Sequence, residues 1–545
     1  MSDTENKSYV SYQKKSKKSP YLPMMFALVL AGGLFLGNII GNGNKNKPSL
    51  GAEIENNKME HILNFIENKY VDTINTQELE TKAINDMLSN LDPHSFYIPP
   101  VNVKDINDDM RGDFEGVGVE FFIVDDTITI VNAIANGPSE RVGILAGDKI
   151  LAINDSIVAG VGVKNKDVIK LLKGAKGTRV KVTMLRRSEK IDFKITRGKI
   201  PLYSLDIAYM LNKETGIIKL NKFSRTTYTE FHKGLSKLLR QGVKNLIVDL
   251  RGNGGGYLRE AVFIADEFLD GKKIVVYTEG THYDREEHTA GRPGNFEEGK
   301  LIILIDESSA SASEILAGAL QDWDRATIIG RRSFGKGLVQ EQYPMPDNSA
   351  LRLTVARYYI PSGRSIQKPY SDKKHYKTEV YDRYTNGEFY NEDSIPHLDT
   401  TQYYTKIKKR QVYGGGGITP DVFVPFDTVK NNIYVNRLKR KVPEFIYNYY
   451  SNHQEEFKQY NSVENFISNF NISEKMFNNF LINAEKNGWK KDFSKMNENK
   501  QNVKEFMKAY FAKQLFQDDG YFRIVYKKDP VIIEALKQIN SKETK

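Results

Sequence analysis

A serine-rich segment stands at the start of a predicted helix and could supply a nucleophile. It reads Ser308-Ser309-Ala310-Ser311-Ala312-Ser313, and a helical pattern of small and apolar residues continues over 312–321. The N-terminus of a helix favours developing negative charge, which suits a serine alkoxide. Serines and alanines at a helix start also serve capping and tight packing. The segment by itself therefore leaves both a catalytic and a structural interpretation open.

A serine nucleophile needs a base, and lysine is a better candidate here than histidine. The eight histidines belong to no triad motif, and they are His61, His94, His232, His282, His288, His375, His397 and His453. We interpret His94, next to Pro93, as a turn residue. Lys336 lies between two glycines, which leave room for its side chain to enter a packed site. Burial disfavours the ammonium form and lowers the pKa, so a neutral Lys336 amine can accept the serine proton.

Two glycine-rich loops invite a nucleotide-binding interpretation. Residues 330–336 match G-x-x-x-x-G-K, but Gly337 stands where a magnesium-binding Ser or Thr belongs. Gly254, Gly255 and Gly256 lack the third spaced glycine of a dinucleotide fingerprint, yet consecutive glycines make a nest of N–H donors. The chain contains no cysteine, so thiolate metal sites and a cysteine nucleophile are excluded. We expect no metal and no other cofactor.

The chain is long enough for several folded units to position these residues. Its 545 residues predict roughly three or four domains. With 40% hydrophobic and 27% charged residues, the composition excludes a wholly disordered chain and a polytopic membrane protein. The net charge of +10 is spread along the chain, so no nucleic-acid partner is expected.

The N-terminal segment carries a membrane signal. Lys14, Lys15, Lys17 and Lys18 precede residues 21–40, which contain no charged residue. About 20 such residues span a bilayer, and basic residues before them stay in the cytoplasm. We expect an uncleaved anchor, with a cleaved signal peptide as the alternative.

Beyond this segment, the periodicity changes from helical to α/β. Apolar residues at helical spacing predict two helices that end before Asp92-Pro93. Short strands with turn signals follow from Asp113, and buried-type strands alternating with helices over 202–425 predict parallel crossover units. Strands are expected at 216–220, 246–250, 274–277, 301–305 and 326–329.

Residues 111–198 resemble a PDZ domain through landmarks that occur in order. These are Gly116-Val117-Gly118-Val119, Gly137-Pro138-Ser139, Gly143-Ile144, Ala146-Gly147-Asp148 and Ile153-Asn154. In such domains the N–H groups of the glycine loop bind a terminal carboxylate while the next strand pairs with the peptide. The resemblance therefore implies that Gly116, Val117, Gly118 and Val119 bind the carboxylate of a peptide.

The chain as a whole is similar to the carboxyl-terminal processing proteases, tail-specific serine peptidases of the S41 type with a PDZ domain. The motifs that carry this similarity are Leu91-Asp92-Pro93-His94-Ser95, Asp249-Leu250-Arg251-x-Asn253, Ser311-Ala312-Ser313-Glu314, Gly335-Lys336-Gly337 and Pro361-Ser362-Gly363-Arg364. The resemblance implies an α/β, crotonase/ClpP-like peptidase core with an inserted PDZ domain. An N-terminal helical hairpin, a membrane span and a C-terminal helical extension complete the expected fold.

The resemblance also assigns the site. It implies that Ser311 is the nucleophile, Lys336 the base and Gln340 the residue that holds the lysine. The backbone N–H groups of Ala312 and Gly255 are the implied oxyanion donors. Gly254 departs from the family, which commonly has proline at that position.

The implied function is a serine endopeptidase that cuts protein substrates near their C-termini and binds those termini in its PDZ domain. The expected substrates end in free, apolar C-termini. A catalytically inactive PDZ scaffold that captures C-termini is the alternative. We expect the protein in a bacterial cell envelope, anchored in the inner membrane with its catalytic domains in the periplasm, or secreted if the span is cleaved. A homo-oligomer or an adaptor is a further expected partner.

The predicted boundaries follow from these assignments. They are a cytoplasmic basic tail at 1–20, an anchor or signal peptide at 21–41, a linker at 42–56, an N-terminal helical region at 57–110, the PDZ domain at 111–198, the peptidase core at 199–430 and a helical C-terminal extension at 431–545. Packing against the core is the expected role of the extension, and oligomerisation or partner docking is the alternative.

Overall fold

The computed structural model of the protein describes residues 58–428, 432–490 and 492–541, with a few positions between 21 and 33. It divides into two compact units, Met1–Ile84 and Asn85–Lys545. Within the described residues, no helix combines the length and the apolar character that a bilayer crossing requires. Most of the predicted span at 21–41, the basic tail and the linker lie outside the described residues.

Both predicted N-terminal helices are present. They are α3 (Lys58–Lys69) and α4 (Thr76–Ser89), and α4 ends just before the Asp92-Pro93 turn, as predicted. No side chain of α3 is buried, so the packing of the two helices as a hairpin stays a prediction. A further helix, α5 (Pro100–Arg111), begins with proline at its first position, where the missing N–H costs no hydrogen bond.

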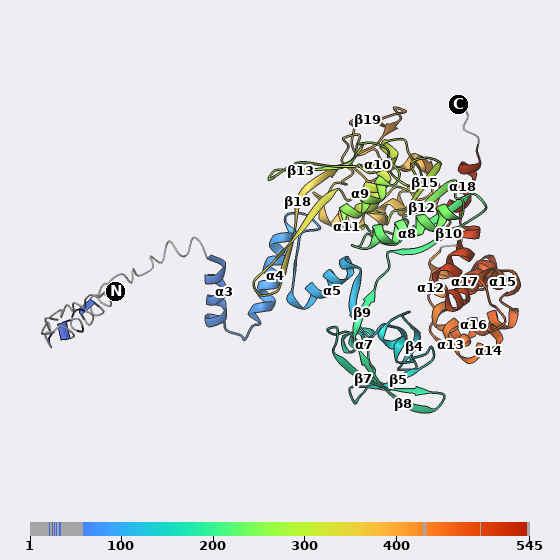
Figure 1. Ribbon diagram of the computed structural model, residues 1–545, viewed down its shortest axis with the longest axis horizontal. Coiled ribbons are helices and arrows are strands. Elements are labelled where there is room, and N and C mark those ends of the chain that lie inside the picture. The colour runs from blue at the N-terminus through green and yellow to red at the C-terminus, as the bar shows by residue number, and fades with distance from the viewer. Residues whose placement is uncertain are drawn as a thin grey trace, which may run out of the picture. The chain divides into compact units, whose positions relative to one another are not determined.

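The region that resembles a PDZ domain forms a six-stranded antiparallel sheet with two helices (Figure 1). Its strands are β3 (Val119–Val124), β4 (Thr127–Ala133), β5 (Lys149–Ile153), β6 (Ser156–Ile157), β7 (Arg179–Arg186) and β8 (Glu189–Thr196). The helices are α6 (Pro138–Arg141) and α7 (Asn165–Leu172). Alternate apolar side chains such as Ile128 and Ile130 are fully buried. The strands β2 (Asp113–Gly116) and β9 (Gly198–Pro201) pair with each other where the chain enters and leaves this region.

The peptidase core is built on a second six-stranded sheet, of order β10-β11-β12-β15-β16-β21. These strands are β10 (Leu205–Met210), β11 (Thr215–Leu220), β12 (Asn245–Asp249), β15 (Lys300–Ile305), β16 (Thr327–Gly330) and β21 (Val422–Phe423). All neighbours from β11 to β21 pair in parallel, as the alternation of strands and helices predicted.

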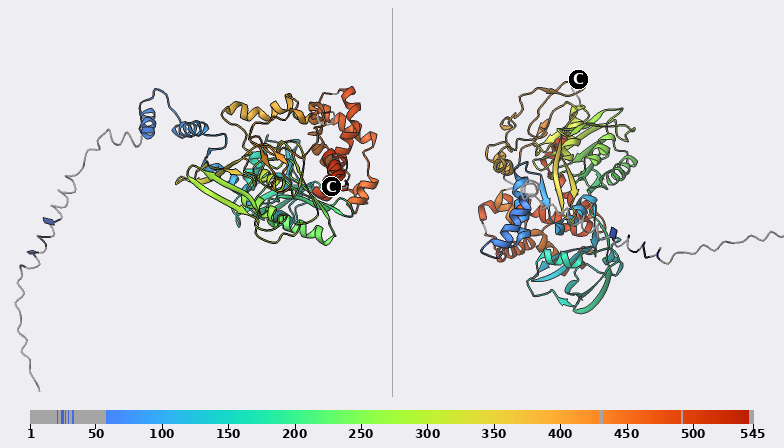
Figure 2. Two further views of the ribbon diagram at one scale, coloured as in Figure 1. Left: turned by 90° about the horizontal axis from the view of Figure 1, so that it is seen from above. Right: turned by 90° about the vertical axis from the view of Figure 1, so that its left-hand side faces the viewer.

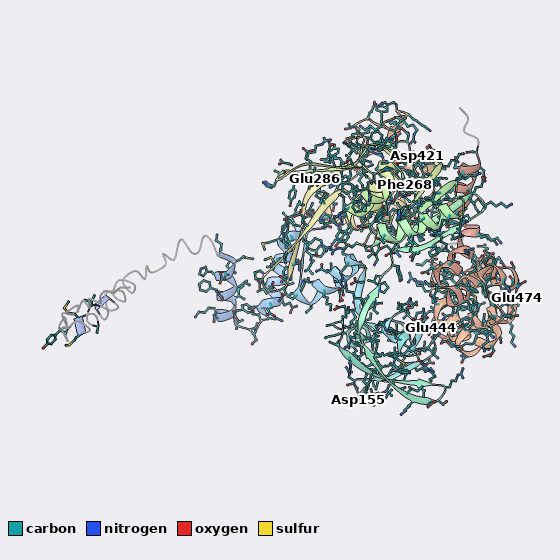
Figure 3. The ribbon with its side chains drawn as sticks, viewed as in Figure 1. Asp155, Phe268, Glu286, Asp421, Glu444 and Glu474 are labelled. Atoms are coloured by element: carbon teal, nitrogen blue, oxygen red, sulfur yellow. The ribbon has the colours of Figure 1, made fainter. Side chains whose placement is uncertain are left out.

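Both faces of this sheet are covered, which explains its continuous apolar strands. One face packs against α8 (Thr227–Arg240), α9 (Leu258–Asp266) and α10 (Ala312–Asp322). Phe268, labelled in Figure 3, is fully buried in that layer. The opposite face packs against α18 (Pro530–Asn540), from the far end of the chain.

A five-stranded antiparallel sheet lies beside this core. Its strands are β1 (Phe96–Ile98), β13 (Ile274–Gly280), β14 (Tyr283–Thr289), β17 (Leu338–Pro344) and β18 (Ala350–Tyr359). The strand predicted at 274–277 is thus present, but it joins this sheet and not the parallel one. The reason is the β13–β14 hairpin, whose antiparallel pairing directs β13 to β18.

The C-terminal extension is helical, as predicted, and has its own hydrophobic core. Its main helices are α12 (Ile433–Lys439), α13 (Val442–Asn452), α15 (Val463–Asn469), α16 (Glu474–Lys486) and α17 (Phe493–Val525). The Tyr447 hydroxyl donates to the carbonyl of Ile130 in the PDZ-like sheet at 2.7 Å. The Tyr526 hydroxyl donates to the carboxylate of Asp249 at the end of β12, also at 2.7 Å. These two hydrogen bonds join the extension to both regions. Figure 2 shows the chain from two further sides.

Candidate active site

Ser311 lies immediately before α10, and its backbone is strained. Its φ is +56° and its ψ −115°, a conformation that residues with a Cβ rarely adopt. The Ser311 N–H donates to Oε2 of Glu314 at 2.8 Å. The Ser311 carbonyl accepts a hydrogen bond from the Tyr358 hydroxyl at 3.1 Å. These buried partners hold the residue in a conformation that it would not keep alone.

The hydrogen bonds of the neighbouring serines set Ser311 apart. The Ser309 hydroxyl donates to the carbonyl of Leu250, and the Ser313 hydroxyl donates to the carbonyl of Asn253, each at 2.9 Å. Both of these serines are fully buried. The Ser311 hydroxyl donates no hydrogen bond to any described residue, and Ser311 lines a pocket of about 800 Å³. Of these three hydroxyls, that of Ser311 is the one available to a substrate.

A buried carboxylate joins the serine to the lysine loop. Glu314 is 1% exposed, and its two oxygens accept from the N–H groups of Ser311, Gly335 and Lys336 and from the Ser333 hydroxyl. Burial raises the pKa of Glu314, and these four donors oppose that rise. Glu314 thereby fixes the backbone of the Ser311 turn relative to that of Lys336, which the sequence did not predict.

Lys336 projects into the same pocket as Ser311. Its ammonium donates to Oε1 of Gln340 at 2.9 Å, and the Gln340 amide donates to the carbonyl of His94. Burial, followed by the positive charge of Arg352, lowers the pKa of Lys336. The Lys336 amine and the Ser311 hydroxyl form no hydrogen bond with each other. The structure thus brings Ser311, Lys336 and Gln340 to one pocket.

Histidines play a smaller part in this pocket. The Asp92 carboxylate accepts from the N–H groups of His94 and Ser95, which forms the predicted turn. The His94 ring is hydrogen-bonded to the Tyr376 hydroxyl at 2.7 Å. Burial and the charge of Lys336 lower the pKa of His94 to about 4, so the ring is neutral at neutral pH. Among the described histidines, His288 on β14 is the one that lines the pocket.

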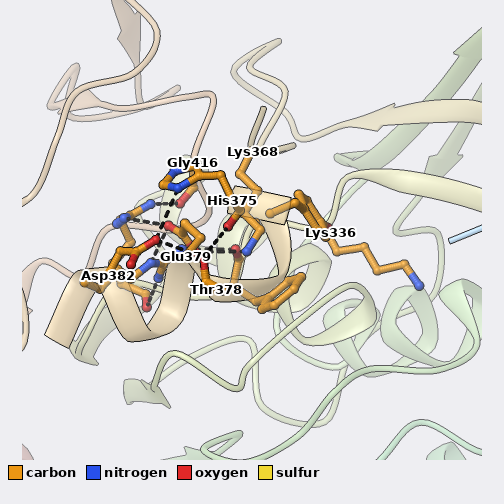
Figure 4. A network of polar contacts seen from close by, with 12 residues as sticks. Lys336, Lys368, His375, Thr378, Glu379, Asp382 and Gly416 are labelled. Atoms are coloured by element: carbon orange, nitrogen blue, oxygen red, sulfur yellow. Dashed lines mark hydrogen bonds and ion pairs between the residues drawn. The ribbon is translucent and has the colours of Figure 1, made fainter. Parts of the chain in front are cut away.

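A buried ion network is hydrogen-bonded to the backbone of the loop that leads to Lys336 (Figure 4). Arg383, on α11 (Lys373–Thr385), donates to the backbone carbonyls of Arg332, Ser333 and Phe334 at 2.8–3.2 Å. The Glu379 carboxylate accepts from the side chains of Arg383, Lys368 and Arg332. In Figure 4 the Lys336 side chain extends away from this network. The network therefore holds the backbone before Lys336 and leaves its amine to the pocket.

Tyr358 and Arg383 were not found by sequence reasoning. The Tyr358 hydroxyl donates to the carbonyls of both Ser311 and Lys336, so it joins the two chain segments. Burial raises the pKa of Tyr358 well above its ordinary range, which keeps the phenol protonated as a donor. Neither residue stands in a distinctive motif, and each lies well away from Ser311 in sequence.

Comparisons with known proteins identify the family of this chain. The sequence model of peptidase family S41 matches residues 214–373, and that of the PDZ domain matches residues 116–196. Residues 434–518 match a family of unknown function (DUF8443). A carboxy-terminal-processing protease of Bartonella bacilliformis is 37% identical over 313 residues, which cover 56% of this chain and 71% of that protein. The chain belongs to the carboxy-terminal-processing protease family.

Two further similarities are a curated relative and a solved structure. A probable CtpA-like serine protease of Staphylococcus haemolyticus is 32% identical over 370 residues, which cover 67% of this chain and 74% of that protein. A solved photosystem II D1 C-terminal processing protease is 24% identical, with a TM-score of 0.35, over 67% of this chain and 86% of that chain. The protein is thus a serine-type peptidase with a PDZ domain, which confirms the family and the enzyme class predicted from the sequence.

The glycine loop of this protease lies directly against the Ser311 turn. A Cβ on Gly255 would come within 2.7 Å of the Ser311 Cβ and 2.9 Å of the Ala312 nitrogen, and Gly255 has a φ of +95°. Only glycine fits this approach. The Ala312 N–H has no acceptor within the described chain, so it is available to a developing oxyanion. The Gly255 N–H donates to the Asn253 side chain at 2.9 Å, so its oxyanion role stays a prediction.

The PDZ domain of the protease presents a second pocket, of about 630 Å³. Val117, Gly118 and Val119 line it, together with apolar side chains of Phe114 on β2 and Ile169 on α7. The N–H groups of Val117 and Gly118 have no acceptor among the described residues. Gly116 differs from the prediction, because it pairs with Gly198 in the β2–β9 ladder and does not line the pocket.

The described residues contain no group of three or more His, Cys, Asp or Glu side chains arranged to hold a metal ion. The residues gathered around Ser311 present a hydroxyl, an amine and backbone N–H donors, which are groups that acyl transfer can use.

Proposed function

We propose that this protease cleaves proteins near their C-termini with Ser311 as the nucleophile and Lys336 as the general base. One observation carries the proposal: a hydroxyl that donates no hydrogen bond and an amine whose pKa is lowered by burial share one pocket. A neutral amine accepts a proton, which the ammonium form of an exposed lysine cannot do. The neighbouring serines are committed to backbone carbonyls and cannot serve.

The reaction then proceeds in two halves. The Lys336 amine leaves Gln340, approaches Ser311 and takes the hydroxyl proton as the serine oxygen bonds to the scissile carbonyl carbon. The Ala312 N–H stabilises the oxyanion of the tetrahedral intermediate. Lys336 returns the proton to the leaving amine when the peptide bond breaks. Water, deprotonated by the same lysine, then hydrolyses the acyl-enzyme and restores the Ser311 hydroxyl.

The PDZ pocket is proposed to bind the substrate C-terminus. Its free N–H groups at Val117 and Gly118 suit a carboxylate, and the apolar lining from Phe114 and Ile169 suits apolar end residues. Asp109 on α5 lines both this pocket and the catalytic pocket. A substrate held by its terminus is thereby kept close to Ser311.

Mass spectrometry tests the proposed cleavage. The purified protein is incubated with an unfolded protein that ends in apolar residues, and the masses of the products are recorded. We expect loss of a C-terminal segment with the wild-type protein and none with Ser311→Ala. Equal cleavage by the two proteins would refute the dyad.

We propose an envelope location on the evidence of the sequence alone. Residues 21–40 carry no charge and follow a basic segment, which supports an inner-membrane anchor with the catalytic domains in the periplasm. Treating intact cells with protease, before and after the outer membrane is permeabilised, tests this topology. A homo-oligomer or adaptor remains a prediction.

A further inference from the structure

Arg352 is a half-buried guanidinium in the catalytic pocket that lacks an acidic partner. It lies on β18, opposite Phe96 of β1 and Gln342 of β17. One of its terminal nitrogens donates to Oε1 of Gln342 at 2.8 Å, and its guanidinium lies 5.4 Å from the centre of the Phe96 ring. No carboxylate of the described residues lies within 4 Å of it, and its other N–H groups have no acceptor there.

Other buried arginines of this protein have carboxylate or carbonyl partners, although Nε of Arg364 has no hydrogen-bond partner. Arg251, Arg332, Arg364 and Arg383 each form an ion pair with a carboxylate. Arg325 has no carboxylate partner but donates to four backbone carbonyls. Removing a guanidinium from water without a partner is unfavourable, so buried arginines are normally paired. Arg352 departs from this pattern at the place where a substrate must bind.

The acidic residues of the same pocket are engaged elsewhere. Asp109 forms an ion pair with Lys222 at 2.8 Å, and Glu341 accepts from the hydroxyls of Tyr283 and Tyr343. Glu286, labelled in Figure 3, faces His288 on the same strand at 3.9 Å. Arg352 therefore keeps an open fork of donors toward the pocket, a geometry that matches a carboxylate in bidentate fashion.

We infer that Arg352 forms a subsite that binds a carboxylate of the substrate close to the scissile bond. The inference rests on the proposed function, since it places a substrate peptide in this pocket. The carboxylate has two sources: an Asp or Glu side chain near the cleavage point, or the free C-terminus of the short tail that is removed. The subsite is separate from the glycine loop of the PDZ domain, which lies in the other pocket.

Paired peptides test the side-chain source. Each pair is identical except for Glu or Gln at one position, and that position is moved stepwise along the residues flanking the cleavage site. With the wild-type protein we expect kcat/KM to favour the Glu peptide about tenfold at one position. Arg352→Gln should abolish that preference, and Arg352→Lys should keep part of it. The ratio within a pair cancels any effect of Arg352 on the Lys336 base. Arg357→Gln, an exposed arginine on the same strand, is the matched control and should keep the preference.

Amidated peptides test the other source. A loss on amidation that disappears in Arg352→Gln assigns the terminal carboxylate to Arg352, whereas a loss that persists in that variant belongs to the PDZ domain. If no position shows a Glu preference and Arg352→Gln leaves the amidation effect unchanged, the inference is wrong.

Binding measurements separate this inference from the proposed function. Dissociation constants of the same labelled peptides are measured by fluorescence anisotropy on Ser311→Ala protein, with and without Arg352→Gln. A charge preference that depends on Arg352 supports the subsite even if the wild-type protein cleaves nothing, in which case the proposed function alone fails. Charge-independent binding together with normal cleavage overturns the subsite alone.

Discussion

The catalytic pocket and the PDZ pocket differ in the burial of the charged and polar side chains around them. Around Ser311 the fixing groups are buried: Glu314, Tyr358 and Arg383 are each 1% exposed. Around the PDZ pocket, two of the three acidic side chains of α5 that line it form exposed ion pairs, whereas the third, Asp108, is buried and pairs with Arg111. Asp105 pairs with Lys173 and Asp109 with Lys222, each at 2.8 Å, and the two aspartate side chains are 65% and 67% exposed.

This difference suits the two tasks. Buried, fully hydrogen-bonded groups fix a reaction geometry because each alternative position would leave a donor or carboxylate unpaired. Exposed ion pairs contribute about 0–1 kcal/mol each, so breaking the Asp105–Lys173 pair at the rim of the PDZ pocket costs little. The catalytic pocket is thus the more firmly fixed of the two.

The largest effect is expected from the dyad itself. Ser311→Ala and Lys336→Ala should each reduce kcat/KM by roughly 10³-fold or more, because one removes the nucleophile and the other its base. Circular dichroism and thermal unfolding should stay close to wild type. His288→Ala, which changes the one described histidine of the pocket, is the control. Near-normal turnover in Lys336→Ala together with loss in His288→Ala would assign the base to histidine.

Disrupting the buried ion network around Arg383 should lower both the stability and the activity of the protein. Arg383→Met removes the donor to three carbonyls before Lys336, so we expect a loss of about 3 kcal/mol in unfolding free energy, with reduced kcat. Urea denaturation followed by fluorescence measures the shift. Lys377→Met, an exposed lysine on the same helix, should change neither quantity. Equal urea midpoints for the two variants would show that the buried ion network is dispensable for stability.

Amidating the substrate C-terminus should have an intermediate effect. The N–H groups of Val117 and Gly118 would lose a charged acceptor, worth about 1.5 to 3 kcal/mol, so kcat/KM should fall roughly ten- to a hundredfold. Steady-state kinetics on matched free-acid and amidated peptides measure it. Identical rates would mean that neither pocket reads the terminal carboxylate.

The pH dependence of kcat/KM tests the assignment of Lys336 as the base in the catalytic pocket. Activity requires the neutral amine, so kcat/KM should rise with pH through a Lys336 pKa that lies below the ordinary lysine value. Burial and Arg352 lower this pKa, while the carboxylates of Glu314 and Asp92 raise it, and His94 stays neutral nearby. Arg352→Gln removes a positive charge that lowers the pKa of Lys336, so the acidic limb of the pH profile should move to higher pH. A limb that shifts to lower pH in this variant would contradict the assignment of Lys336 as the base.

The smallest effect is expected at the rim of the PDZ pocket. Asp105→Asn breaks the pair with Lys173, which loosens the rim of the PDZ pocket and makes it easier for a substrate to enter. KM should therefore fall by a factor of about two to five, in line with the energy of an exposed ion pair. Asp155→Asn breaks a comparable 2.8 Å pair with Lys181 that does not line the pocket, and it should leave KM unchanged. A large fall in kcat for Asp105→Asn would mean that α5 belongs to the rigid centre.

The sequence by itself determined what depends on local pattern. Apolar periodicity predicted the parallel strands such as 246–250 and the helix after Ser311, because a strand or helix must bury one face. The motifs around Ser311 and Lys336 predicted the two residues now found in one pocket. The family resemblance singled out Gly255, and the structure supplies the reason for a glycine there, since its backbone lies too close to Ser311 for a side chain.

Tertiary structure decided everything that depends on distant partners. Arg383 and Tyr358 have no local signature, and their importance comes from the carbonyls that the fold brings to them. The same holds for β13, whose place in the antiparallel sheet is set by pairing with β14 and β18. Arg352 is ordinary in sequence and becomes unusual only because the fold buries it without a carboxylate. Local propensity is encoded residue by residue, whereas burial and charge pairing exist only once segments far apart in the chain have met.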